Sequence, residues 1–144
     1  NLFNPSKVYF GEKDYQQTQI IKKLIFLEKI NVKMIICPTI REKNGLALSS
    51  RNNLLSNSEK ADSSIIYNSL KVLKNNFKTL NLNKIKKDII IEINKNKNLK
   101  VEYFEVVNAS TLQIDSKVNP KESYRAFICV KANEVRLIDN ILLN

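Results

Sequence analysis

Two short segments of this 144-residue chain carry side chains suited to phosphate chemistry. The first, FGEKDYQQ, runs from Phe10 to Gln17 and places a glycine and a lysine just before two glutamines. A glycine at a turn lets the backbone approach a ligand closely, and a lysine supplies a mobile positive charge for phosphate. Gln16 or Gln17 can offer a donor and an acceptor to a small polar substrate. Taken alone, the segment fits an ordinary charged turn followed by two solvent-exposed helix residues better than a ligand site.

The second segment, PTIREKNGLALSSRN, covers residues 38–52. Its stretch Leu48–Arg51 combines two hydroxyls and a guanidinium after the flexible Gly45. Hydroxyls, loop N–H groups and an arginine suit a phosphate whose charge grows during transfer. Ser-Ser-Arg is also common in loops without any ligand, so this segment alone leaves the chemistry open.

The elements around the first segment predict how it is positioned. Residues 7–10 predict a short strand that ends at Gly11, residues 16–29 have apolar positions at helical spacing, and residues 32–37 form an apolar run typical of a strand buried on both faces. Strand, helix and strand form a βαβ unit, which needs further strands from a larger Rossmann-like sheet or from another chain. Ligands bind at the carboxyl ends of such strands, where the following helix offers N–H groups to an anion.

The rest of the chain predicts helices and then strands. A loop over 38–53 leads to a capping box at Ser56 and Glu59, which begins a helix to about residue 78. A second helix is expected over 82–95, strands over 101–107 and 124–130, and a third strand or closing segment over 135–139. A polar turn is expected at 119–122. The expected inward helix positions are Ala61, Ile65, Ile66, Leu70, Leu73, Phe77, Leu82, Ile85, Ile89 and Ile93.

We therefore expect an α/β fold in two parts. Residues 1–41 would be the last βαβ portion of a Rossmann-like nucleotide-binding domain with a parallel sheet. Residues 42–144 would be a small α+β C-terminal domain with an antiparallel sheet.

Composition excludes several classes of protein. The chain has no His, so a zinc site or a Cys–His nucleophile is not expected, and we predict no metal ligands. Cys37 and Cys129 are isolated in apolar runs, which predicts buried, reduced thiols in a cytoplasmic protein. No apolar run approaches a membrane span, and the N-terminus does not resemble a signal peptide.

The formal net charge of +10 is concentrated in residues 71–100, where nine lysines face two acidic residues. A basic surface can bind nucleic acid, but few arginines or aromatic residues accompany these lysines. A solvated helix face is the favoured interpretation, and a nucleic-acid-binding module stays an alternative.

The two segments together are more specific than either alone. The chain contains a G-E-K-D-x-Q-Q segment, then P-T-x-R-x-x-x-G-L-A-x-S-S-R-N after a gap of 20 residues, and a closing R-L-I-D-N at 136–140. Together these motifs resemble the pantothenate synthetase (pantoate–β-alanine ligase) family. The resemblance is to the C-terminal half of these enzymes. It spans essentially the whole chain and is densest before residue 56 and near the end.

The resemblance implies roles for individual residues. The G-E-K-D turn and the residue before the arginine of P-T-x-R would bind ATP, and the second glutamine would bind pantoate. The A-x-S-S-R loop would close over the phosphates, with Lys13 and Arg51 neutralising charge and the two serines donating hydrogen bonds. The implied nucleotide-binding residues are Gly11, Glu12, Lys13, Asp14, Ile40, Leu48, Ser49, Ser50 and Arg51. Gln17 would bind pantoate. The implied catalytic residues are Lys13, Ser49, Ser50 and Arg51.

The family's reaction has two steps. The pantoate carboxylate attacks the α-phosphorus of Mg-ATP to give pantoyl adenylate and pyrophosphate, and the β-alanine amine then releases AMP and pantothenate. The family's His-x-Gly-His motif and other pantoate contacts belong to an N-terminal half, and its members form homodimers. Since this chain has no His, we expect it to be inactive alone. A structural remnant without a ligand, associating through open sheet edges, is a further alternative.

Overall fold

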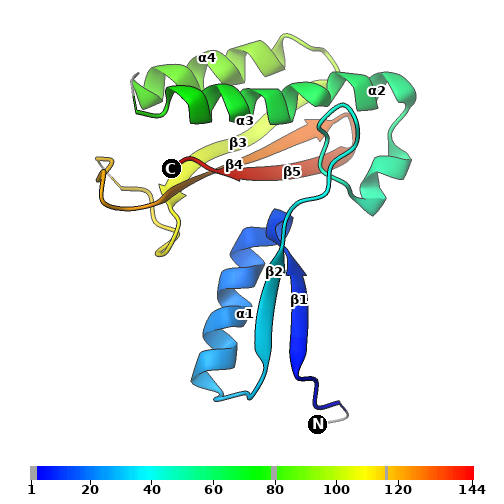
Figure 1. Cartoon of the computed structure of the whole chain (residues 1–144). Coiled ribbons are helices and arrows are strands. Elements are labelled where there is room, and N and C mark those ends of the chain that lie inside the picture. The colour runs from blue at the N-terminus through cyan, green and yellow to red at the C-terminus, as the bar shows by residue number, and fades with distance from the viewer. Residues whose placement is uncertain (1–2, 79–80, 116) are drawn as a thin grey trace. The chain divides into compact units, whose positions relative to one another are not determined.

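The computed structural model describes residues 3–78, 81–115 and 117–144 (Figure 1). Contacts within the chain divide it into two compact units, Asn1–Ile40 and Arg41–Asn144. The predicted domain boundary lies one residue further along the chain.

The first unit is a parallel βαβ arrangement. Strand β1 (Lys7–Gly11) leads through the 3₁₀ turn η1 (Glu12–Asp14) into helix α1 (Tyr15–Leu27), and strand β2 (Lys33–Cys37) follows. The two strands pair in parallel, with Lys7 opposite Lys33. The predicted βαβ unit is therefore confirmed.

Burial in this unit differs from the prediction. Thr18 is buried on α1, but the apolar stripe Ile20, Leu24 and Leu27 is exposed by 66%, 46% and 61%. Ile36 on β2 is also exposed by 39%, so the predicted burial of this strand on both faces is wrong for the unit as described. A two-stranded sheet with one helix against it covers too little surface to bury both faces of either element.

The second unit places helices on one face of an antiparallel sheet. Its helical segments are η2 (Ser50–Leu54), α2 (Asn57–Asp62), α3 (Ser64–Asn76) and α4 (Leu82–Asn94), and its strands are β3 (Leu99–Asn108), β4 (Tyr124–Ala132) and β5 (Val135–Leu142). The strand order is β3-β4-β5, and α4 packs against β3 while α3 packs against β5 and β4 (Figure 1). The third strand is thus a full strand, and the predicted α+β architecture is confirmed.

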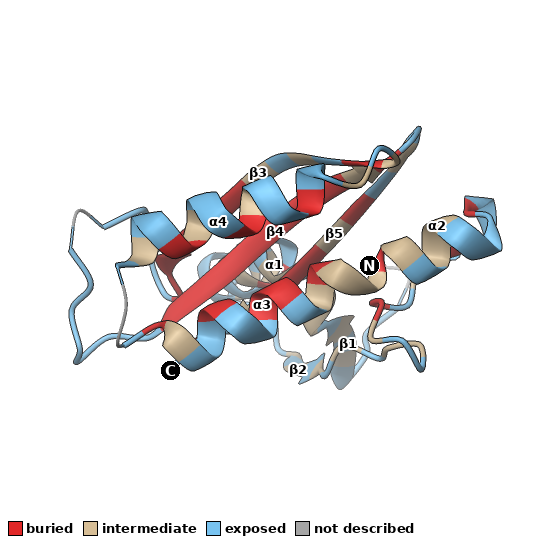
Figure 2. Ribbon diagram, turned by 90° about the horizontal axis from the view of Figure 1, so that it is seen from above, coloured by how far each residue is buried: buried red, intermediate tan, exposed pale blue. Residues whose placement is uncertain are grey.

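The core of the second unit lies between this sheet and the two long helices. Seen from the helix side in Figure 2, β4 is buried almost along its whole length. The predicted inward positions Ile66, Leu70, Leu73, Phe77, Ile85, Ile89 and Ile93 are all buried in this core. Each fully buried Leu or Ile side chain contributes roughly 1.5–3 kcal/mol through removal of apolar surface from water.

The helix predicted from residue 56 to 78 is interrupted. The capping box that begins it is confirmed, since the Ser56 N–H donates to Glu59 and the Glu59 N–H donates to Ser56 Oγ. Ser63 separates α2 from α3, and its buried hydroxyl donates to the Glu59 carbonyl at 2.7 Å. Such back-bonding by serine competes with the helical ladder and bends helices. Because the break changes the phase of the preceding turn, Ala61 is exposed, and its predicted inward position is wrong.

The two cysteines are both free but differ in environment. Cys129 on β4 is fully buried, and its thiol donates to Glu102 Oε2 at 3.1 Å. Burial, with this carboxylate beside it, raises the pKa of the Cys129 thiol to about 12. Cys37 is only half-buried, so the prediction of two buried thiols is confirmed for Cys129 alone. In the described part of the chain, no helix is long and apolar enough to cross a bilayer.

Candidate functional site

The first candidate segment lies at the carboxyl end of the parallel strands. Gly11 is the last residue of β1 and stands opposite Cys37 in the register. The turn after Gly11 and the Pro38–Ile40 segment after Cys37 therefore leave the same end of this sheet. This is the end at which open α/β sheets bind their ligands.

Gly11 has ordinary extended backbone angles, with φ −74° and ψ 133°. A Cβ added there would meet nothing within 4 Å, so the fold of the described residues does not require a glycine at this position. What the glycine provides is open space in front of the turn, which suits close approach of a ligand to the backbone.

The other predicted residues of the first unit follow this turn. Glu12 and Lys13 are half-buried in η1, Asp14 is exposed at the start of α1, and Gln17 is exposed on the first turn of that helix. Ile40, the last residue of the unit, is 70% exposed. The structure thus gathers the predicted nucleotide and pantoate ligands of this unit at the strand ends.

The second candidate segment begins with a tight hairpin. Arg41 and Ala47 form an isolated antiparallel bridge, and the Glu42 N–H donates to the Leu46 carbonyl at 2.8 Å. Gly45 closes the turn with a φ of +92°, and a Cβ there would lie 2.9 Å from Tyr67 Cδ1. This position accepts only glycine without strain, both for its backbone and for its contact with α3.

Arg41 fixes the hairpin to the sheet. Its guanidinium donates to Asp139 through both terminal nitrogens, at 2.6 and 3.0 Å, and to the Gly45 carbonyl at 3.1 Å. It also lies 3.6 Å from the centre of the Tyr67 ring. The Arg41 and Asp139 side chains are only 17% and 3% exposed, so this is a buried, bidentate pair.

A second polar contact connects the hairpin to the residue after the Ser-Ser-Arg stretch. Asn52, in η2, is 3% exposed, and its amide nitrogen donates to Glu42 Oε1 at 2.7 Å and to the Ala47 carbonyl at 3.2 Å. Leu46 and Ala47 are buried beneath. Asn52, just after the Leu48–Arg51 stretch, is therefore bonded to Ala47, just before it, and to the hairpin.

The loop itself points its functional groups outward. Ser49 caps η2, since its hydroxyl oxygen accepts from the Arg51 N–H at 3.3 Å. Leu48, Ser50 and Arg51 are exposed. Of the four residues predicted to close over phosphates, Leu48, Ser50 and Arg51 are thus exposed and Ser49 is half-buried, on an anchored base.

The predicted site residues fall into two sets, one in each unit: Gly11–Asp14, Gln17 and Ile40, and then Leu48–Arg51. Sequence reasoning assigned no role to Arg41, Glu42, Asn52 or Asp139. The signal was present, because Arg41 and Asn52 are fixed letters of the quoted P-T-x-R and S-S-R-N patterns. Asp139 belongs to the closing R-L-I-D-N.

That closing motif is now explained by its contacts. Arg136 donates to Glu102 Oε2 at 2.5 Å, Asp139 pairs with Arg41, and Asn140 accepts from Arg125. Each polar letter of the motif in β5 therefore has a partner on another segment.

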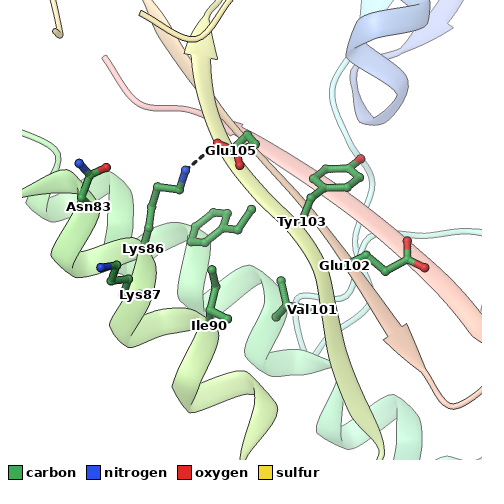
Figure 3. Close-up of a pocket in the computed structure, with 9 residues that line it drawn as sticks. Asn83, Lys86, Lys87, Ile90, Val101, Glu102, Tyr103 and Glu105 are labelled. Carbon is green, nitrogen blue, oxygen red and sulfur yellow. Dashed lines mark hydrogen bonds and ion pairs between the residues drawn. The ribbon is translucent and has the colours of Figure 1, made fainter. Parts of the chain in front are cut away.

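A separate hollow of about 520 Å³ lies between α4 and the edge strand β3 (Figure 3). Lys86 and Lys87 line it, but so do Glu102 and Glu105, and Lys86 pairs with Glu105 at 2.6 Å. The mixed charge differs from the continuous positive groove that tracks a nucleic-acid backbone. Among the described residues, no cluster of three or more His, Cys, Asp or Glu side chains is placed to hold a metal ion.

Comparison with known proteins identifies the family. The model of the pantoate-beta-alanine ligase family matches residues 1–142. The chain belongs to this family. It is 41% identical over 142 residues to a pantothenate synthetase of Flavobacterium psychrophilum, covering 99% of this chain and 50% of the relative. The pantothenate synthetase of Clostridium acetobutylicum is 40% identical, with 100% of this chain and 51% of the relative covered.

Solved structures of the family agree with this fold. The pantothenate synthetase of Thermus thermophilus is similar with a TM-score of 0.85 and 27% identity, over 96% of this chain and 50% of that protein. The pantoate-beta-alanine ligase of Francisella tularensis, complexed with beta-gamma ATP and beta-alanine, has a TM-score of 0.69 and 34% identity over 96% and 44%. The chain spans about half the length of the curated relatives it matches.

Proposed function

We propose that this chain supplies the C-terminal half of the active site of an ATP-dependent pantoate–β-alanine ligase. The observation that carries the proposal is the largely exposed Leu48–Arg51 stretch on an anchored base, in a chain of this family. A fixed loop with an outward guanidinium and a serine hydroxyl suits stabilisation of charge that develops on phosphate oxygens. The ATP complex of the Francisella tularensis relative agrees with use of this nucleotide.

The proposed chemistry assigns each group a task. A carboxylate oxygen of pantoate attacks the α-phosphorus of ATP, and pyrophosphate leaves as pantoyl adenylate forms. The amine of β-alanine then attacks the acyl carbon, loses a proton and displaces AMP. Lys13 and Arg51 neutralise the phosphates, and Ser49 and Ser50 donate hydrogen bonds to them. Gly11, Glu12, Asp14, Ile40 and Leu48 contact the nucleotide, and Gln17 contacts pantoate.

Mg²⁺ would enter this site with the phosphates of ATP. The described residues hold no acidic cluster that would form a protein cage, and Mg²⁺ characteristically binds through one or two carboxylates together with phosphate oxygens and water. Asp14 and Glu12 are the carboxylates nearest in sequence to the proposed phosphate ligand Lys13. No step above depends on the ion.

The complete site would also need the N-terminal half. The chain has no His to provide the family's His-x-Gly-His motif, and the exposed stripe Ile20, Leu24 and Leu27 is a surface that a larger sheet domain would cover. Inactivity of the chain alone, a homodimeric whole enzyme and a cytoplasmic location are parts of this proposal. The nucleic-acid alternative is weakened by the mixed charge of the hollow beside α4.

A fusion protein tests the proposal. In it, this chain replaces the matching C-terminal half of the Flavobacterium psychrophilum relative, and release of pyrophosphate and pantothenate is measured with ATP, pantoate and β-alanine. We expect activity in the fusion, none in the chain alone, and a strong loss of pyrophosphate release after Lys13→Ala or Arg51→Ala. A fusion as active after Arg51→Ala as before would sink the assignment.

A further inference from the structure

We infer that Asn52 is a positioning residue that holds the Leu48–Arg51 loop in its outward conformation, with Glu42 as the group that orients it. The inference rests on the proposed function for the meaning of that loop, and it adds two residues to which that proposal gives no task. The loop conformation itself can be measured independently of any ligand.

Asn52 makes its contacts at the base of the Leu48–Arg51 loop. The Asn52 amide nitrogen reaches back over five residues to the Ala47 carbonyl at 3.2 Å, so the two ends of the Leu48–Arg51 stretch are joined by one side chain. The backbone Asn52 N–H also donates to the Ser49 carbonyl at 3.0 Å. A loop with its ends joined loses most of its alternative conformations, because closure removes backbone entropy before any ligand arrives.

The Asn52 amide has one defined orientation. Its nitrogen faces two acceptors, Glu42 Oε1 and the Ala47 carbonyl, and neither position would tolerate the amide oxygen. The Asn52 Oδ1 is buried and has no hydrogen-bond partner among the described residues. A buried carbonyl without a donor is unfavourable, so the two bonds made by the nitrogen must outweigh it.

The hairpin in turn holds Glu42 in place. Its backbone N–H bonds the Leu46 carbonyl, and the neighbouring Arg41 is held by Asp139 on β5. A continuous series of contacts therefore runs from the sheet through Arg41, Glu42 and Asn52 to the loop. Groups that bind a reacting phosphate act best when neighbouring contacts lock them in place.

The test compares three variants of the 144-residue chain with the wild type. Asn52→Asp replaces the donating nitrogen by an oxygen facing Glu42, and Glu42→Gln keeps an oxygen acceptor for the Asn52 amide. Asn53→Asp is the matched control, since Asn53 is the next residue of η2 and is exposed. Amide hydrogen exchange of residues 49–54 reports the loop, and amides of β4 report the core. Calorimetric titration with a stable pantoyl-adenylate analogue reports ligand binding, measured on the same variants in the fusion with the N-terminal half of the Flavobacterium psychrophilum relative.

We expect Asn52→Asp to speed exchange in the loop by about tenfold, because two hydrogen bonds are lost, while β4 exchange stays unchanged. Binding of the analogue should weaken by a similar factor, and Glu42→Gln and Asn53→Asp should resemble the wild type. Unchanged loop exchange in Asn52→Asp would overturn the inference, as would faster loop exchange with unchanged binding. If the fusion with the wild-type chain binds no analogue but loop exchange responds as expected, the proposed function fails while the conformational role of Asn52 stands.

Discussion

Arg41 and Asp139, 98 residues apart in the chain, form a buried bidentate ion pair in which Nη1 lies 2.6 Å from Oδ2 and Nη2 lies 3.0 Å from Oδ1. The pair joins the beginning of the second unit to its last strand. It explains why the P-T-x-R motif and the closing R-L-I-D-N motif, far apart in the sequence, contact each other in the fold. The hairpin that carries the Leu48–Arg51 loop is held against β5 by this contact.

Asp139→Asn should therefore destabilise the second unit. The change removes the charge that compensates the largely buried guanidinium of Arg41, and breaking one side of such a pair costs about 3 kcal/mol. Urea denaturation followed by circular dichroism measures the loss. Glu92→Gln is the control, because its pair with Lys95 is exposed on both sides and should contribute less than about 1 kcal/mol. Equal stabilities of the two variants would refute a structural role for the Arg41–Asp139 pair.

The two glycines of the chain should respond differently to alanine. Gly45→Ala introduces a Cβ 2.9 Å from Tyr67 Cδ1 at a φ of +92°, so we expect a loss of more than about 1 kcal/mol in the free energy of unfolding. Gly11→Ala meets open space and should leave that free energy unchanged. In the same variant, binding of an adenylate analogue should weaken because the added methyl group narrows the approach to the turn. A neutral Gly45→Ala would show that the hairpin adopts another conformation.

The two thiols should differ strongly in reactivity toward iodoacetamide. Cys129 is fully buried, and raising its pKa from 9.0 to about 12 leaves roughly a thousandfold less thiolate at neutral pH. We expect Cys37 to be modified first in the native chain and Cys129 only on unfolding, as followed by peptide mass spectrometry. Both should react at similar rates in denaturant. Rapid labelling of Cys129 under native conditions would contradict the described packing of β4.

The loss of folding stability at acidic pH should depend on Glu102. Hydrogen bonds, first from Arg136 and then from the Cys129 thiol, lower the pKa of the Glu102 carboxyl below its ordinary value of 4.5. A carboxyl with a lowered pKa in the folded state stabilises that state above the unfolded pKa, and this contribution is lost as the pH falls through the folded pKa. Glu102→Gln should therefore flatten the dependence of stability on pH below about 4.5.

The control for this measurement is Glu134→Gln, which removes the same charge from the exposed turn between β4 and β5. Its profile of unfolding free energy between about pH 3 and pH 7 should follow that of the wild type. If the unfolding free energy of Glu102→Gln falls at low pH as it does in the wild type, the Arg136–Glu102 contact is absent in solution.

Periodicity and capping patterns were sufficient for much of the fold. The 3.6-residue spacing correctly placed Leu70, Leu73, Ile89 and Ile93 in the core, and the capping box correctly began α2. The interruption at Ser63 was not predictable, because whether a serine back-bonds its helix depends on its burial in the tertiary structure. The exposure of Ile20, Leu24 and Leu27 was missed for a related reason, since spacing identifies an apolar stripe but not what covers it.

In the candidate site, too, the sequence indicates some residues, while the contacts of others depend on the tertiary structure. Residue type makes phosphate chemistry conceivable at Ser49, Ser50 and Arg51, but only the family resemblance assigns these residues a role in nucleotide binding. Asn52 is a fixed letter of the S-S-R-N pattern, but neither Asn52 nor Glu42 shows in the sequence which group it contacts. Their contacts depend on how the hairpin folds back. Their roles became visible only through distances in the structure.

We expect the Leu48–Arg51 loop to hold the phosphate of an acyl adenylate once the N-terminal half completes the site. The decisive measurement is calorimetric titration of the fusion protein, in which this chain replaces the C-terminal half of the Flavobacterium psychrophilum relative, with a stable pantoyl-adenylate analogue in Mg²⁺ and at moderate salt. Saturable binding should be lost in Arg51→Ala and retained in Arg136→Ala, which removes the same side chain from β5. Equal binding by the Arg51→Ala fusion and the unchanged fusion, or no binding by the unchanged fusion, would refute this role of the loop.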